Sequence, residues 1–139
     1  MEVNDFMESY GSGNDRKTLK MIAITREGIS YPDFEEYVAD SPFDISQWAS
    51  FLHLSERTLH RYKKDQKNFE PLQSEKILEL LMLQKHSQKV FDKPEHFRSW
   101  LNTESIALGG IKPISVLDSG FGIDLIRDEL TRIEHGVFA

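Results

Sequence analysis

Apolar residues recur along this chain at helical spacing, separated by short polar or proline-containing stretches. Leu19, Ile22 and Ala23 share one face and predict a helix over 18–27 that stops at Gly28, although the MIAIT run within it would also suit a short strand. Pro32 fits the first turn of a second helix, which should end before Pro42, because a residue that precedes proline is disfavoured in helical geometry.

Two short helices joined by a tight turn are predicted between residues 44 and 65. Asp44 can cap the first helix, and Ser55 can cap the second after a turn at His53–Leu54. Apolar residues follow Asp44 at i, i+3, i+4 and i+7: Ile45, Trp48, Ala49 and Leu52. Leu59 and Tyr62 should face inward on the second helix. The pattern is typical of a helix-turn-helix.

After a connector over 66–73, a longer helix is expected that is capped by Ser74 and ends near Phe91. Its apolar residues cover nearly the whole circumference: Ile77, Leu78, Leu80, Leu81, Met82 and Leu83. A helix that is apolar all round is buried, so it should lie between the two halves of the chain or in a subunit interface.

Three short helical signals fill the remainder of the chain, starting at Pro94, at Pro113 and near Gly120. Glycine at 109 and 110 favours a positive φ or a close approach of two backbones. Gly136 is a typical helix stop. Some apolar surface should stay exposed near the last helix and the tail, at Phe121, Val137 and Phe138.

One set of residues in this region resembles a known family. The set is Trp100-Leu101, Ala107-Leu108-Gly109-Gly110, Pro113, Leu117, Gly120, Leu130, Ile133 and His135-Gly136. Its order and spacing resemble the C-terminal domain of the Xre/MbcA/ParS antitoxins, which partner toxins that carry a RES domain. The resemblance extends back to about Phe43, roughly two thirds of the chain.

The pattern and the resemblance together predict an all-α fold. A flexible N-terminus is expected over 1–17, an Xre-like helix-turn-helix lobe over 18–70, a connecting helix over 71–91, and a small helical toxin-binding lobe over 92–139.

Charge is distributed unevenly along the 139 residues. The net charge is −6, which is the wrong sign overall for a nucleic-acid-binding protein, yet residues 53–69 hold five bases and two acids, or +3. From Asp92 onward there are eight acids and five bases, or −3. A basic middle and an acidic end indicate two different partners. We expect a cytoplasmic protein without a secretory signal, because the chain contains no cysteine, no basic and apolar leader and no apolar run near ~18 residues.

The basic stretch suits DNA. Arg57, His60, Arg61 and Lys64 fall at i, i+3, i+4 and i+7 on the second helix of the predicted motif, which enters the major groove in such proteins. The alternative is an ordinary solvated charged face. The residues predicted to contact operator DNA are Ser55, Arg57, Thr58, His60, Arg61, Lys63 and Lys64.

Catalytic and metal-binding motifs are not found. The five histidines are scattered without an HExxH pattern, no G-x-S-x-G element occurs, and GGIKPIS lacks the GxxxxGK[ST] pattern of a phosphate loop. We therefore expect no enzyme activity, no metal and no cofactor.

The resemblance implies an antitoxin that binds a RES-domain toxin, covers its NAD⁺ cleft and acts as a dimer that also represses its own operon. Such toxins consume NAD⁺ by phosphorolysis or use it for ADP-ribosylation. The acidic residues Asp124, Asp128 and Glu129 would face the toxin or only water. The implied toxin-binding residues are Trp100, Asn102, Gly109, Gly110, Lys112, Pro113, Gly120, His135, Gly136 and Val137. The alternative is a plain helix-turn-helix transcriptional regulator whose C-terminal lobe only dimerises.

Overall fold

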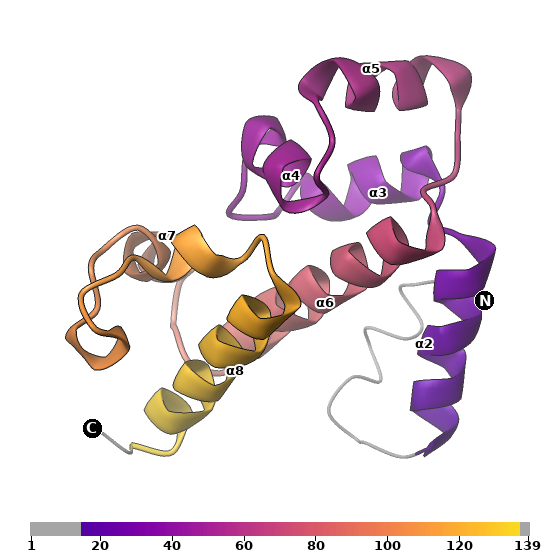
Figure 1. Ribbon diagram of the computed structural model, residues 1–139. Coiled ribbons are helices and arrows are strands. Elements are labelled where there is room, and N and C mark those ends of the chain that lie inside the picture. Colours follow the sequence, from indigo (N-terminus) through magenta and orange to yellow (C-terminus); the bar gives the residue numbers. More distant parts are fainter. Residues whose placement is uncertain (1–14, 137–139) are drawn as a thin grey trace.

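The computed structural model describes residues 15–136, which form an all-α fold (Figure 1). The α-helices are α2 (Asp15–Glu27), α3 (Tyr31–Val38), α4 (Ile45–Phe51), α5 (Glu56–Asp65), α6 (Pro71–Ser87), α7 (Pro94–Leu101) and α8 (Gly120–Glu134). Two 3₁₀ turns, η1 (Ile106–Leu108) and η2 (Pro113–Val116), lie between α7 and α8. Within residues 15–136 every helix is too short or too polar to span a bilayer.

Helix α2 confirms the first predicted helix and shows that the strand alternative for MIAIT was wrong. It starts at Asp15, so the last three residues of the segment predicted to be flexible are helical, while residues 1–14 lie outside the described part of the chain. The helix stops at Gly28, whose φ is 90°. A Cβ on Gly28 would lie 2.5 Å from the carbonyl oxygen of Phe69, so only glycine fits this approach.

The N-terminal lobe is built on an aromatic cluster. The Phe34 ring packs edge-on against Trp48 at 5.4 Å and contacts Phe69 at 4.8 Å, and Phe43 packs against Trp48 at 5.6 Å. The buried Trp48 indole N–H donates to the Ser41 hydroxyl at 3.0 Å. These contacts fix α3 and α4 around one core, and the Tyr62 ring of α5 packs against Phe69 of the same cluster at 5.5 Å.

The connecting helix differs from its prediction at both ends. It begins at Pro71 after Glu70, whose backbone N–H donates to the Gln73 side chain at 3.0 Å, and it ends at Ser87 rather than near Phe91. Ser74 is therefore not its cap. The Ser74 hydroxyl is fully buried and accepts the backbone N–H of Ile29 at 3.0 Å, because the helix passes directly under the start of α3.

Burial of α6 is confirmed. Ile77, Leu78, Leu80, Leu81 and Leu83 are each no more than 5% exposed. The helix lies against α2 on one side and α8 on the other, and it runs beneath the N-terminal lobe (Figure 1). Its apolar circumference therefore belongs to one core that both lobes share.

The C-terminal lobe packs α8 against η2. A Cβ on Gly122 would lie only 1.7 Å from the carbonyl oxygen of Val116, so the two backbones touch at this point. Gly109 and Gly110 have positive φ, as predicted, but a Cβ at either position would meet nothing within 4 Å. The predicted close approach at these two glycines was wrong within this chain, and it occurs at Gly122 and Gly28 instead.

Candidate functional site

The turn between α4 and α5 has the geometry of a helix-turn-helix. After Leu52 the chain turns at His53, whose φ is 57°, and the Ser55 hydroxyl accepts the backbone N–H of Thr58 at 3.0 Å to start α5. The same hydroxyl donates to the Thr58 hydroxyl at 2.9 Å. Ser55 and Thr58 thus hold the N-terminus of α5 in position, in addition to any contact with phosphate.

The predicted basic face is present on α5. Arg57, His60, Arg61 and Lys64 are all exposed, whereas Leu59 and Tyr62 on the opposite side are buried. Arg57 lies in the first turn, where recognition helices contact base edges. The face therefore presents three permanent positive charges and one imidazole along a single side of the helix.

Lys63 lies beside this face and has a protein partner. Its ammonium group is 3.0 Å from the Glu35 carboxylate of α3, and that hydrogen bond raises the pKa of Lys63 above its usual value. A phosphate group would have to compete with Glu35 for Lys63. The exposed Lys67, which was absent from the predicted set, lies 4.7 Å from the centre of the Tyr62 ring and 3.8 Å from Glu70. The only signal in the sequence for including Lys67 among the candidate DNA-binding residues is its place in the basic stretch over 53–69.

Two of the predicted toxin-binding residues, Trp100 and Pro113, are part of the packing of the C-terminal lobe. Trp100 is half-buried and its ring lies 5.8 Å from Phe91 and 6.3 Å from Phe97. Pro113 is fully buried. Asn102 is exposed, and its amide donates to the carbonyl of Arg98 at the end of α7, at 2.8 Å. Trp100 and Pro113 would therefore contribute to binding mainly through the shape of the lobe.

The other predicted residues lie at the surface. Gly109, Gly110, Lys112, Gly120, His135 and Gly136 are exposed, and Val137 lies outside the described residues. Ser105 and Ile111 pair across the base of the loop that carries Gly109 and Gly110, so this loop has a defined shape. These residues lie on one small lobe at three separate places: the loop between η1 and η2, the start of α8 and the end of α8.

The end of α8 is attached to α6. The His86 ring nitrogen Nε2 lies 2.9 Å from Glu134 Oε1, and this hydrogen bond, more than any other interaction, lowers the pKa of Glu134. Glu129 is 7% exposed and hydrogen-bonded to Arg132 at 2.7 Å. The expectation that Glu129 faces a partner or water was therefore wrong, whereas Asp124 and Asp128 are exposed.

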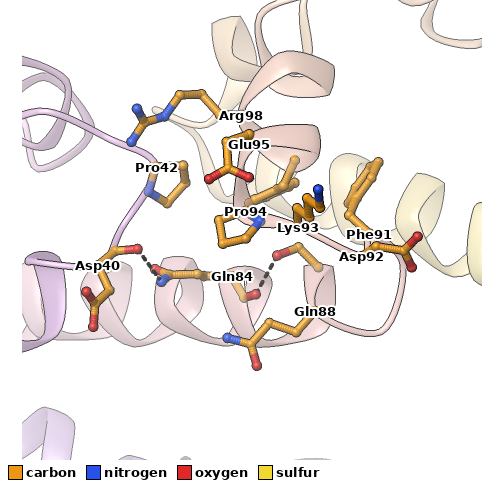
Figure 2. Close-up of a pocket in the computed structure, with 12 residues that line it drawn as sticks. Asp40, Pro42, Gln84, Gln88, Phe91, Asp92, Lys93, Pro94, Glu95 and Arg98 are labelled. Carbon is orange, nitrogen blue, oxygen red and sulfur yellow. Dashed lines mark hydrogen bonds between the residues drawn. The ribbon is translucent and has the colours of Figure 1, made fainter.

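A hydrogen bond joins the two lobes directly, and a further one joins the N-terminal lobe to the connecting helix α6. His53 Nε2, in the helix-turn-helix turn, lies 3.0 Å from the backbone carbonyl oxygen of Asp118, just before α8. The Gln84 amide of α6 donates to the carbonyl of Asp40 at 3.2 Å (Figure 2). The two predicted binding surfaces are thus parts of one connected body.

A cavity of about 300 Å³ lies beside this second contact. Figure 2 shows the Arg98 side chain extending toward Pro42 on one side of this space, with Gln84 below it. Its lining mixes acids, bases and apolar rings. Across residues 15–136, groups of three or more side chains that could hold a metal ion are absent. The features that stand out are therefore two exposed surfaces, a basic helix and a small lobe, both suited to binding macromolecules.

This combination defines a helix-turn-helix protein with a second, smaller lobe packed on the same core. Residues 20–82 match the family model described as the antitoxin Xre-like helix-turn-helix domain, and residues 86–136 match the antitoxin Xre/MbcA/ParS C-terminal toxin-binding domain. The chain belongs to the Xre/MbcA/ParS antitoxin family, as the sequence pattern predicted.

A curated relative aligns with most of the chain. It is the Prs ADP-ribosylating antitoxin of Sphingobium sp. (strain YBL2), which is 27% identical over 127 residues, covering 85% of this chain and 80% of that protein. The boundary between the two matched domains falls between residues 82 and 86, inside α6.

Proposed function

We propose that this protein neutralises a RES-domain toxin that consumes NAD⁺, by covering the toxin's active site with its C-terminal lobe. Inhibition would require binding alone and no catalysis by this chain. The observation that carries the proposal is the match of residues 86–136 to a toxin-binding domain. The curated relative is named an ADP-ribosylating antitoxin, and ADP-ribosylation consumes NAD⁺, which supports this class of toxin.

Charge supports the same partner. A cleft that binds the phosphates of NAD⁺ is expected to be positively charged, and the chain from Asp92 onward has eight acids and five bases. Complementary charge speeds association and favours the correct partner over others. The exposed loop at Gly109–Gly110 and the exposed end of α8 at His135–Gly136 are the proposed contact points.

We propose in addition that α5 binds operator DNA in the cytoplasm and thereby represses the operon. The exposed Arg57, Arg61 and Lys64 support this step, because they present positive charge along the face of α5 opposite its buried side. Proteins of this type bind two half-sites as dimers, so the proposal includes a homodimer that joins the toxin in a larger complex.

Coexpression with a RES-domain toxin from the same genome tests the neutralising role. The full chain should restore growth and NAD⁺ levels and should copurify with the toxin. A variant that ends at His135 keeps the contact between His86 and Glu134 and should lose protection. Binding of the truncated variant to DNA shows that it is folded. If the full chain neither copurifies with the toxin nor restores NAD⁺, it is a plain regulator.

Gel shifts with the upstream region of the gene test the DNA-binding role. Arg57→Ala alone should lose about 1–3 kcal/mol of binding free energy if it contacts a base edge. The Arg57→Ala/Arg61→Ala double variant should bind still more weakly and show a smaller salt dependence. A matched control removes two exposed charges from the other lobe, Lys93→Ala/Arg98→Ala. Equal affinity of both double variants would refute the role of α5.

A further inference from the structure

One exposed face of α8 carries an aromatic residue that no other part of the structure covers. Phe121, Asp124, Leu125 and Asp128 follow at i, i+3, i+4 and i+7 and therefore share one side of the helix. Phe121 is 91% exposed and Leu125 is 40% exposed. We call these four residues the outer face of α8. The opposite side, with Gly122, Ile123, Ile126 and Leu130, is buried.

The backbone under Phe121 is held firmly. The contact between Gly122 and Val116 fixes the first turn of α8 against η2, and Ile123 is only 1% exposed. The Ser119 hydroxyl accepts the backbone N–H of Phe121 at 3.2 Å. A phenyl ring on such a fixed backbone loses little conformational freedom on binding, so its burial contributes to affinity with a small entropic cost.

We propose that the outer face of α8 is the specificity-determining contact with the toxin, with Phe121 inserted into an apolar pocket rimmed by basic side chains. This inference rests on the proposed toxin-neutralising function and adds the chemistry of the partner surface. The face lies within the segment matched to a toxin-binding domain. Aromatic residues, phenylalanine among them, are enriched in the buried centres of protein interfaces.

The charges on this face select the kind of partner. Asp124 is 63% exposed and pairs with Arg127 on its own helix, and the exposed Asp128 and Asp118 lie to either side along the chain. A basic rim would be attracted to these carboxylates. A second copy of this chain fits less well, because a two-fold contact through the same face would place acid against acid.

The test measures binding of the full chain to the RES-domain toxin captured in the coexpression experiment. Phe121→Ser should weaken the affinity about 30-fold, mainly through faster dissociation. Asp128→Asn should slow association and reduce its dependence on salt. The matched control is Leu72→Ser in α6, because Leu72 is 80% exposed and lies outside α8 and outside the loop at Gly109–Gly110. This control should bind like the wild type.

Each other result contradicts a separate step. If wild type binds the toxin and Phe121→Ser binds equally well, the inference is overturned while the proposed function stands. If Leu72→Ser loses as much affinity as Phe121→Ser, the loss is not specific to α8 and the inference is again overturned. If Phe121→Ser changes only the molar mass of the free protein in light scattering, the face joins two copies. If wild type binds no toxin, both proposals fail.

Discussion

Replacing Gly122 with alanine tests how closely α8 is packed against η2. The added methyl carbon would lie 1.7 Å from the Val116 carbonyl oxygen and 2.6 Å from its carbonyl carbon, where ordinary contacts are 3.4–4 Å. Both obstacles are backbone atoms, so no change of rotamer can relieve the overlap. The helix itself must move, and the buried Ile123 and Ile126 must move with it.

The expected magnitude follows from two opposing effects. Alanine is favoured over glycine in a helix interior by about 1 kcal/mol. Forcing extra atoms into a packed site costs about 1–3 kcal/mol and occasionally more. Because the overlap here is with backbone and exceeds 1.5 Å, we expect the upper end of that range and a net loss of about 2 kcal/mol.

Urea unfolding followed by circular dichroism measures this loss. With a slope of about 1–3 kcal/mol per molar urea, the midpoint should fall by about 1 M. Gly120→Ala is the control, because Gly120 is in the same helix and a Cβ there meets nothing within 4 Å. A midpoint for Gly122→Ala at or above that of Gly120→Ala would refute the argument from close packing.

Leu81→Ala should lower the free energy of unfolding by about 2–5 kcal/mol, because Leu81 is buried. The control Leu72→Ala, at a position that is 80% exposed, should change it by less than ~0.5 kcal/mol. Equal urea midpoints for the two variants would contradict the shared core. Glu79→Gln should stabilise the protein at neutral pH, because burial, followed by the charge of Glu75, raises the pKa of Glu79 and makes its ionised form unfavourable in the folded protein. Below pH 4.5 this carboxyl group is protonated in the folded and the unfolded protein alike, so the stabilising effect should disappear in thermal melts there. Glu134→Gln should act in the opposite sense. The hydrogen bond with His86 lowers the pKa of Glu134, so the wild type has a contribution above pH 4.5 that is lost as the pH falls through the lowered pKa; acid titration of the variant should show a weaker pH dependence in that range.

Local signals were sufficient to predict most of the helices. Asp44 and Ser55 are side-chain caps, and the structure shows both of them accepting the expected backbone N–H groups. The start of α6 was misplaced because Ser74 resembled a cap, although Pro71 marked the true first turn. Ser74 instead contacts Ile29, 45 residues away, and local sequence carries no signal for such a contact.

The candidate surfaces were predictable to different degrees. The basic face of α5 follows from helical periodicity alone, and so could be placed from the sequence. The partner of Lys63 could not, because Glu35 lies on another helix. Glycine alone could not distinguish open turns from close contacts either: Gly109 and Gly110 have open space around them, whereas Gly122 touches the backbone of Val116. That difference depends on what the fold places opposite each Cα.

The burial of α6 has a consequence for how such proteins can diversify. Its side chains complete the cores of both lobes, so no cut within the helix would separate two units that fold alone. Recombination between relatives would join an α6 fitted to one lobe with a foreign partner lobe, and would break contacts such as those of Ser74 with Ile29 and His53 with Asp118. Changes of partner are therefore expected to arise by point substitution at exposed positions rather than by exchange of whole lobes, which leaves the interior to vary slowly and as a unit.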